Sequence, residues 1–479
     1  MKRIGKRLVV RSVLGVALCV ALPGLSEAQT GSPRADVDVT PDIQGDINTA
    51  VSNVGKQTLA DVLPEPWKSW NGARRWLAER GLTFAATYQN DSMTALSGGA
   101  KRGSTYYGRL LGSIEWDPEY ATGWKGATFH FSFWQMHGVG ISSHFVRSMS
   151  ALSDLEGVAT TRLSDIWLEQ KFGDLLAVRA GKISADTEFF QTPFYGLGIG
   201  GAFGWAAILG ANLPNGGIAF PFASPGVRVK LTPHPQWTFL AAVFDGDPVG
   251  PGEGNPQTRN RYGANFRLRD PAFAMAEAQW NYSTAWPGTL RIGAWKHFGR
   301  FADQRFAADG RLLSDPAGVG SPLMHRGDGG VYGVLDQQIY QIDGKPTAGA
   351  FVFSRIAAAP SDRNLIDFLV DGGISFQGVV PGRPNDQFGF LGSFARVSRQ
   401  ARLADLDANR FNGAYAPLRN YEAILQATYA YNVADGFVLQ PHVQYVLHPG
   451  AGVVDPMDPL AVRAIRDAFV AGLRMTFNY

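Results

Sequence analysis

The sequence predicts an all-β fold: a transmembrane antiparallel β-barrel of about 16 strands, with 18 as the alternative. Apolar side chains occupy every second position from Phe469 to Tyr479, and polar or glycine residues occupy most positions between them. A period of two describes a strand with one apolar and one polar face. The same alternation recurs upstream in segments of about 10 residues, which is typical of strands that cross a membrane as a barrel.

The first 28 residues have the features of an export signal. Basic residues precede an apolar run over residues 13–22, and Ser26 and Ala28 form a small-x-small cleavage pattern. The run is shorter than the about 20 apolar residues that a spanning helix needs. We therefore expect a signal peptide over residues 1–28, cleaved after Ala28. This cleavage removes the single cysteine, Cys19, so no disulfide is expected in the mature chain.

The charge of the mature chain argues against a nucleic-acid partner. The full chain has a formal net charge of +3, but the leader holds five of the 44 basic residues and one of the 41 acidic residues. The remainder therefore carries a net charge of −1, with no basic excess to attract a polyanion. The 57 glycines and the 12% aromatic content suit tight turns and interfacial aromatic girdles.

The mature chain divides into three regions. Residues 29–66 are polar and lack a periodic apolar face, which predicts a flexible segment before the barrel. Residues 67–80 place apolar side chains at helical spacing, and Gly81 is a suitable terminator, so a short helix is expected there. Residues 81–479 form the predicted barrel domain, whose first strand begins at Leu82.

Alternation identifies several further strands. Trp116 and Trp280 lie on the apolar parity and are expected in the aromatic girdles. The pattern is weak over residues 310–371 and does not fix the strand boundaries there. The segments with clear alternation are residues 105–116, 128–134, 262–270, 274–282, 421–432 and 437–448.

One long stretch, residues 191–225, is rich in glycine and aromatic residues and shows no sustained alternation. A segment of this length without its own periodicity is usually functional or disordered. Its apolar content favours folding inward, so we expect much of it to narrow the pore. The expected constriction residues are Phe194, Tyr195, Phe203 and Trp205.

Four segments share motifs with one known family. They are the W-x-G-x-R pattern from Trp70, LSDIWLEQKFGDLLAVRAGK at residues 163–182, DGGISFQGVVPGR at residues 371–383 and PHVQYVLHPG at residues 441–450. In this order they resemble the carbohydrate-selective porins of the OprB type from Gram-negative outer membranes. The resemblance implies a sixteen-stranded barrel in the outer membrane through which small sugars diffuse passively.

A sugar-selective pore needs aromatic faces that stack on the sugar ring and polar groups that exchange hydrogen bonds with its hydroxyls. Binding must be strong enough to favour entry and weak enough to permit exit. Each candidate aromatic could instead fill the wall, and each candidate charge could simply pair within the lumen. The candidates for the substrate path are Arg109, Glu115, His130, Trp134, Trp167, Glu169, Arg179, Lys182, Glu188 and Glu422.

The sequence offers no catalytic or metal centre, so we expect neither an enzyme nor a cofactor. His130, His137 and His144 recur every seventh residue, which places successive members on opposite faces of a strand and prevents convergence on a metal. Neither a zinc-protease motif nor a nucleophile-elbow motif occurs.

The expected partners are small sugars, outer-membrane lipid and, through the aromatic C-terminal strand, the barrel assembly machinery. The sequence leaves open whether the barrel forms a homo-oligomer. Three alternatives also stay open: a porin with little selectivity or a preference for small organic acids, an outer-membrane barrel enzyme, and a soluble exported sugar-binding protein.

Overall fold

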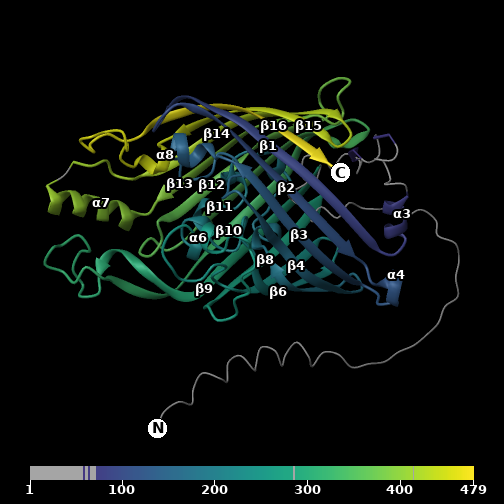
Figure 1. Cartoon of the computed structure of the whole chain (residues 1–479), viewed down its shortest axis with the longest axis horizontal. Helices are drawn as coiled ribbons and strands as arrows, with labels where there is room; N and C mark the ends of the chain where they lie inside the picture. The colour runs from purple at the N-terminus through teal and green to yellow at the C-terminus, as the bar shows by residue number, and fades with distance from the viewer. Residues whose placement is uncertain (1–57, 60–62, 65–71, 284–285, 414) are drawn as a thin grey trace, which may run out of the picture. The chain divides into compact units, whose positions relative to one another are not determined.

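The described residues form a closed barrel. The computed structural model describes residues 58–59, 63–64, 72–283, 286–413 and 415–479. Within these ranges sixteen strands pair antiparallel in chain order, and the first pairs with the last (Figure 1). The predicted fold class and the predicted strand number are both confirmed. No helix in the described part of the chain is long and apolar enough to cross a membrane.

The strands differ in length, and the longest pair projects beyond the others. The strands are β1 Leu82–Gly99, β2 Gly103–Trp116, β3 Ala127–Gly138, β4 Thr160–Phe172, β5 Leu176–Ile183, β6 Ser224–His234, β7 Trp237–Asp245, β8 Ala272–Ser283, β9 Pro287–Ala307, β10 Pro322–Ile342, β11 Lys345–Ala358, β12 Ile366–Gln377, β13 Gln387–Val397, β14 Tyr421–Ala434, β15 Phe437–Leu447 and β16 Arg466–Asn478.

The connections at the two ends of the barrel differ. Most even-numbered strands are followed by short turns, such as residues 173–175 after β4 and 343–344 after β10. The connections after β2, residues 117–126, and after β12, residues 378–386, are somewhat longer. The longest connections follow odd-numbered strands, including residues 139–159 after β3 and 184–223 after β5. In outer-membrane barrels the short turns face the periplasm and the long connections face the exterior.

The helices are short and lie mainly in these connections. The longest, α7, begins after Ser398, whose side chain accepts a hydrogen bond from the Ala401 N–H, and ends before Gly413 in the left-handed conformation. In Figure 1 it lies at the opposite end from α3, α4 and the C-terminus. The helices are α3 Ala73–Ala78, α4 Glu119–Thr122, α5 Ala207–Gly210, α6 Pro256–Arg259, α7 Arg399–Asn412 and α8 Pro449–Gly452.

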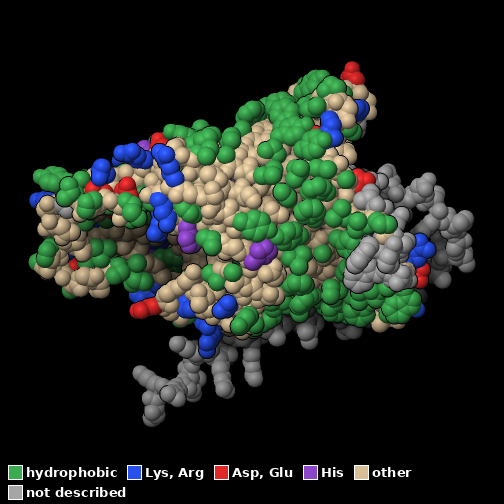
Figure 2. All heavy atoms as spheres, turned by 45° about the horizontal axis from the view of Figure 1, so that its top comes forward, with side chains coloured by type: hydrophobic (Ala, Val, Ile, Leu, Met, Phe, Trp, Pro, Cys, Tyr) green, Lys and Arg blue, Asp and Glu red, His purple; other side chains and the backbone are tan. Residues whose placement is uncertain are grey.

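The outer face of the strands is apolar and the inner face is polar, as the alternation predicts. Phe390, Leu425 and Val443 are exposed on the outside, and hydrophobic side chains cover much of this surface in Figure 2. Near the short turns, Trp280 stacks on Trp237 with ring centroids 5.9 Å apart, and Trp116 stacks on Phe129 at 5.3 Å. These pairs form part of an aromatic girdle.

Some local expectations need correction. The strand predicted over residues 262–270 is wrong, because this stretch belongs to the connection between β7 and β8 and forms no strand ladder. Its Tyr262 carbonyl accepts one hydrogen bond from the Leu163 N–H of β4. Of the helix expected over residues 67–80, the structure describes α3 and places residues 67–71 outside the described ranges. The predicted signal peptide and most of the segment over residues 29–66 also lie outside them.

Candidate pore constriction

Two connections fold back into the barrel instead of extending beyond it. We call them segment A, residues 139–159, and segment B, residues 184–223. They hydrogen-bond to each other where the N–H of Asp154 donates to the Ile199 carbonyl at 2.8 Å. Segment B is largely buried, and segment A is mostly part-buried. Both contact inward-facing side chains of distant strands, such as Gln426 and Gln444. Together they cross the lumen.

Segment B is tied to the opposite wall by Arg355 on β11. The Arg355 guanidinium forms two 2.8 Å hydrogen bonds to Asp371 on β12. It also donates to the carbonyls of Phe190 at 3.2 Å, Gly204 at 2.8 Å and Ala202 at 3.0 Å. The N–H groups of a guanidinium point in fixed directions, so these three hydrogen bonds require the backbone of segment B to lie close to Arg355. Arg355 therefore holds segment B in place.

Glutamine side chains add further ties to segment B. Gln426 on β14 accepts from the Ile199 N–H at 3.1 Å and donates to the Leu197 carbonyl at 3.2 Å. Gln440 on β15 donates to the same carbonyl at 3.0 Å. These bonds satisfy backbone groups that a buried irregular segment would otherwise leave unpaired.

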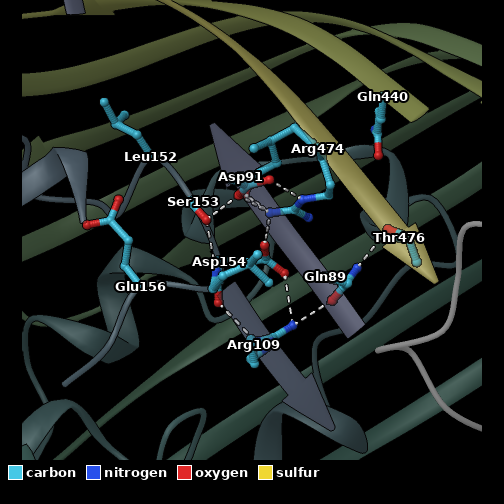
Figure 3. A network of polar contacts seen from close by, with 12 residues as sticks. Gln89, Asp91, Arg109, Leu152, Ser153, Asp154, Glu156, Gln440, Arg474 and Thr476 are labelled. Carbon is cyan, nitrogen blue, oxygen red and sulfur yellow. Dashed lines mark hydrogen bonds and ion pairs between the residues drawn. The ribbon is translucent and has the colours of Figure 1, made fainter. Parts of the chain in front are cut away.

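Segment A is tied by Arg474 on β16, the last strand. Arg474 forms two 2.8 Å hydrogen bonds to Asp91 on β1, and it donates to Asp154 of segment A. The Ser153 hydroxyl donates to Asp91 at 2.5 Å. Figure 3 shows Asp154 between Arg474 and Arg109. Asp154 thus meets guanidinium groups from two strands.

A cavity of about 540 Å³ lies beside these segments. Its size falls within the roughly 300–1,000 Å³ typical of small-molecule sites. Among the described residues, Arg109 is the only cation in its lining, and Asp154, Glu156 and Asp186 are the acidic groups. Trp205, Phe220 and Phe222 supply aromatic surface, and Asn215 and Gln257 supply amides. The lining therefore combines flat apolar faces with hydrogen-bonding groups.

Two of these acids lie in segments A and B, outside the strands, and have unusual titration. Burial raises the pKa of Asp186 to about 7, although its Oδ2 accepts from the Phe220 N–H at 2.9 Å. Its Oδ1 is buried and has no hydrogen-bond partner among the described residues. Burial likewise raises the pKa of Glu156 to about 7, against hydrogen bonds from Ser142. At neutral pH both acids are therefore only partly ionised.

Of the sequence-predicted path residues, Arg109 lies at the cavity. Its guanidinium lies over the rings of Trp134 and Phe220, at 4.5 and 4.7 Å from their centroids, and the two rings also pack against each other. It donates to Gln89 at 3.0 Å and to the Asp154 carbonyl at 3.1 Å. Trp134 is 4% exposed, so it supports Arg109 and is not itself in the cavity lining.

Six further candidates form one cluster on the inner wall toward the short turns. Glu115 bonds to His130 at 3.1 Å, and His130 stacks on Trp167 with ring centroids 4.6 Å apart. The Arg179 guanidinium lies 3.7 Å from the centroid of the Trp167 ring. Four ion pairs then join Arg179 and Arg228 to Glu169 and Glu188, at 2.6–3.0 Å. These charges pair with one another, which is the alternative to a role in sugar binding that the sequence left open.

Two candidates serve other purposes. Lys182 is fully buried, and its ammonium donates to the carbonyls of Gly263 and Asn265. It also pairs in register with the outward-facing Ile166, so it is removed from the predicted path. Glu422 accepts hydrogen bonds from the N–H groups of Met149, Ser150 and Gly450 at 2.6–2.8 Å. It is an anchor for segment A.

The predicted constriction aromatics separate into two groups. Phe194, Tyr195 and Phe203 are buried and pack toward the wall, where Phe194 stacks on Phe353 with ring centroids 5.4 Å apart. Only Trp205 of the four lines the cavity. Its indole N–H donates to the Gly216 carbonyl at 2.9 Å, which fixes the ring.

Sequence reasoning missed the cavity residues Asp154, Glu156, Asp186 and Gln257. Three more, Asn215, Phe220 and Phe222, lie in the segment over residues 191–225 that was expected to fold inward, but they were not among the expected constriction residues. All of them lie in connections, where no parity distinguishes inward from outward side chains. The excess of acidic residues near Ser153 and the aromatic pair around Pro221 were the available signals.

A closed antiparallel barrel with two connections folded across its lumen beside a polar and aromatic cavity defines a porin. The family model described as the carbohydrate-selective porin, OprB family, matches residues 101–479. The chain belongs to this family, and the family and the barrel fold together place it in the outer membrane.

Two relatives illustrate the similarity. Porin B of Pseudomonas aeruginosa is 24% identical over 422 residues, which cover 83% of this chain and 89% of Porin B. A structure of Pseudomonas putida OprB at high pH aligns with a TM-score of 0.77 and 21% identity, over 86% of this chain and 97% of that one. The latter shows a shared fold.

Proposed function

We propose that the protein lets small, uncharged sugars diffuse passively across the outer membrane through the cavity beside segments A and B. The observation that carries this proposal is the cavity lining. Trp205 and Phe220 offer ring faces for stacking. The partly exposed carboxylate of Asp154 and the amides of Asn215 and Gln257 offer hydrogen-bonding groups for hydroxyls. No catalytic step or cofactor is involved.

The balance of charges favours sugars over organic acids. Three carboxyl groups and one guanidinium line the cavity, and the guanidinium of Arg109 is already engaged by Gln89 and Asp154. A carboxylate solute would meet repulsion without a free cation to offset it. A neutral sugar would meet no such repulsion, and the partly exposed carboxylate of Asp154 offers an acceptor to its hydroxyl groups.

The stacking surface is tested at Trp205. In Trp205→Leu, the sugar concentration that half-blocks the single-channel current is expected to rise by about three- to tenfold. This corresponds to the loss of roughly 0.5–1.5 kcal/mol, which is typical of an aromatic contact. The matched control is Trp237→Leu on the outer girdle, which should leave the block unchanged. Equal block in wild type and Trp205→Leu would remove Trp205 from the path.

The acidic lining predicts a pH-dependent ion preference. Because the pKa values of Asp186 and Glu156 are raised to about 7, both groups gain negative charge as the pH rises from 6 to 8. Reversal potentials in a planar bilayer should therefore shift toward cation preference over this range. The double variant Asp186→Asn, Glu156→Gln should lose most of the shift, and an unaltered shift would contradict this assignment.

The remaining expectations concern export and assembly. We propose that residues 1–28 are removed after export, that the C-terminal strand engages the barrel assembly machinery, and that the apolar outer face contacts lipid. Whether copies associate is tested by the mass of the detergent-extracted protein. N-terminal sequencing of the outer-membrane form should begin at Gln29.

A further inference from the structure

Three cations lie together on the outward face of the strand pair β9 and β10. Along β9 the outward positions alternate with buried inward ones such as Trp295 and His297, and Lys296 and Arg300 are outward and exposed. On β10, Arg326 is exposed and lies directly opposite Arg300 in the register. Most of the neighbouring outward side chains are apolar, including the exposed Phe298.

This arrangement is unfavourable without an anion. Like charges directly opposite each other on neighbouring strands are destabilising. Within the part of the chain that the structure describes, none of the three side chains forms a hydrogen bond or an ion pair. The nearby carboxylate of Asp362 is held by Arg363 through bonds of 2.8 and 2.9 Å. Asp328 is buried and accepts from Asn364 at 2.8 Å.

The backbone brings the three groups toward one another. A register shift between Arg326 and Asp328 marks a bulge, and a bulge of this kind re-aims a side chain. Lys296 pairs with Gly329, yet its Nζ lies 3.0 Å from the position that a Cβ on Gly327 would take. The lysine therefore leans along the barrel toward Arg326 and the long connections, as a lysine does when its charge reaches for a membrane surface.

The height of the cluster matches the edge of the hydrocarbon layer. Leu290 pairs with Trp280, a member of the aromatic girdle near the short turns. From Leu290 to Arg300 the strand rises by about 25 Å along the barrel axis, at ~3.3 Å per residue and a tilt of ~40°. The apolar band of such barrels is also about 25 Å tall. Arg300 and Arg326 thus lie where the outer headgroups begin.

We propose that Lys296, Arg300 and Arg326 form a binding site for the phosphate groups of an outer-leaflet lipid. Guanidinium groups bind phosphate in a bidentate manner, and an ammonium adds a point charge. A lipid phosphate at this height offsets the Arg300 and Arg326 repulsion, while its acyl chains cover Phe298 and the neighbouring apolar side chains. The site lies on the outside of the barrel and is separate from the sugar path.

The test is a lipid titration of the full barrel, purified from membranes, stripped of lipid in detergent and monitored by native mass spectrometry. The probes are lipid A with two phosphates, the same lipid with both phosphates removed, and inorganic phosphate. The triple variant Lys296→Gln, Arg300→Gln, Arg326→Gln should bind the phosphorylated lipid about 100-fold more weakly, at about fivefold for each basic residue near a membrane surface.

The matched control removes three other arginines at the same end. Arg399, Arg402 and Arg410 are exposed on α7, and Arg399→Gln, Arg402→Gln, Arg410→Gln should bind lipid as the wild type does. Equal losses in both triple variants would overturn the proposal. So would wild-type affinity for the dephosphorylated lipid, or displacement of the lipid by inorganic phosphate at equal concentration, which would indicate a free-anion site.

A single variant keeps the proposal testable if the triple variant does not fold. Arg300→Gln removes the cross-strand repulsion, so in lipid-free detergent it should denature at a higher temperature than the wild type. Added phosphorylated lipid should then stabilise it less than it stabilises the wild type. Equal stabilisation of both proteins by the lipid would contradict the assignment.

Discussion

Replacement of Arg355 by methionine is expected to widen the channel and to abolish its sugar block. The variant removes the donors that hold the carbonyls of Phe190, Ala202 and Gly204, so segment B loses its tie to β11. It also leaves the Asp371 side chain, which is 0% exposed, without its cation. Breaking a buried ion pair in this way costs about 3–5 kcal/mol. Single-channel conductance measures the widening of the channel. The loss of stability is measured as the temperature at which the barrel unfolds and its migration on a gel changes.

Two comparisons separate the release of segment B from general unfolding. Arg396→Met breaks a pair of the same 2.8 Å length with Asp367, but the Arg396 side chain is half-exposed on the outside. The variant leaves the Asp367 side chain, which is 7% exposed, without its cation. It should therefore lower stability as Arg355→Met does, but leave the conductance unchanged. The double variant Arg355→Met, Asp371→Leu removes the unpaired buried charge and should recover stability while conductance stays high. Wild-type conductance in a folded double variant would show that Arg355 does not position segment B.

Arg474→Gln is expected to have the second largest effect. Asp91 would remain buried at 1% exposure and, among the described residues, would keep the hydrogen bond from Ser153 alone. Asp154 would lose one of its two guanidinium groups. We expect a loss of about 3–5 kcal/mol and a noisier, larger current, because segment A is released beside the cavity. Denaturation in detergent and single-channel noise measure these outcomes.

The control for this variant lies in the connection just before β16. Arg463 pairs with Asp458 at 3.2 Å, but its side chain is 65% exposed, so Arg463→Gln should change neither stability nor current beyond about 1 kcal/mol. A double-mutant cycle of Arg474→Gln with Asp91→Asn should show strong coupling. Additive effects in the cycle would mean that the two residues do not act as a pair.

The alternation of apolar and polar side chains predicted most of the barrel. Each strand faces lipid on one side and the water-filled lumen on the other, so its side chains must alternate in polarity. The prediction failed over residues 262–270, where Tyr262, Phe266 and Leu268 alternate correctly but remain exposed within the connection between β7 and β8. A strand requires a neighbour with which to hydrogen-bond, and single-sequence periodicity does not report neighbours. The helix α7 was missed although Ser398 and Gly413 mark its ends.

The site was less predictable than the wall. Parity on a strand correctly placed Arg109, Trp134 and Glu169 on the inside. Within segment B, however, Trp205 faces the cavity while Phe203 packs toward the wall, and both lie in the same glycine-rich stretch. Their directions depend on carbonyls bound by Arg355 and on glutamines of β14 and β15, which are more than 150 residues away in sequence. Only the folded chain brings these groups together.

The pair of Arg474 and Asp91 joins the last strand to the first, across the seam at which the cylinder is sealed. Neither residue has its partner until β16 docks on β1, and Asp154 is clamped by the same guanidinium. The closure of the barrel and the positioning of segment A across the lumen therefore depend on the same residue, Arg474. In a folding intermediate in which β16 has not yet paired with β1, segment A would not be held across the lumen and the pore would be wider. Selectivity would therefore arise only when the last strand pairs.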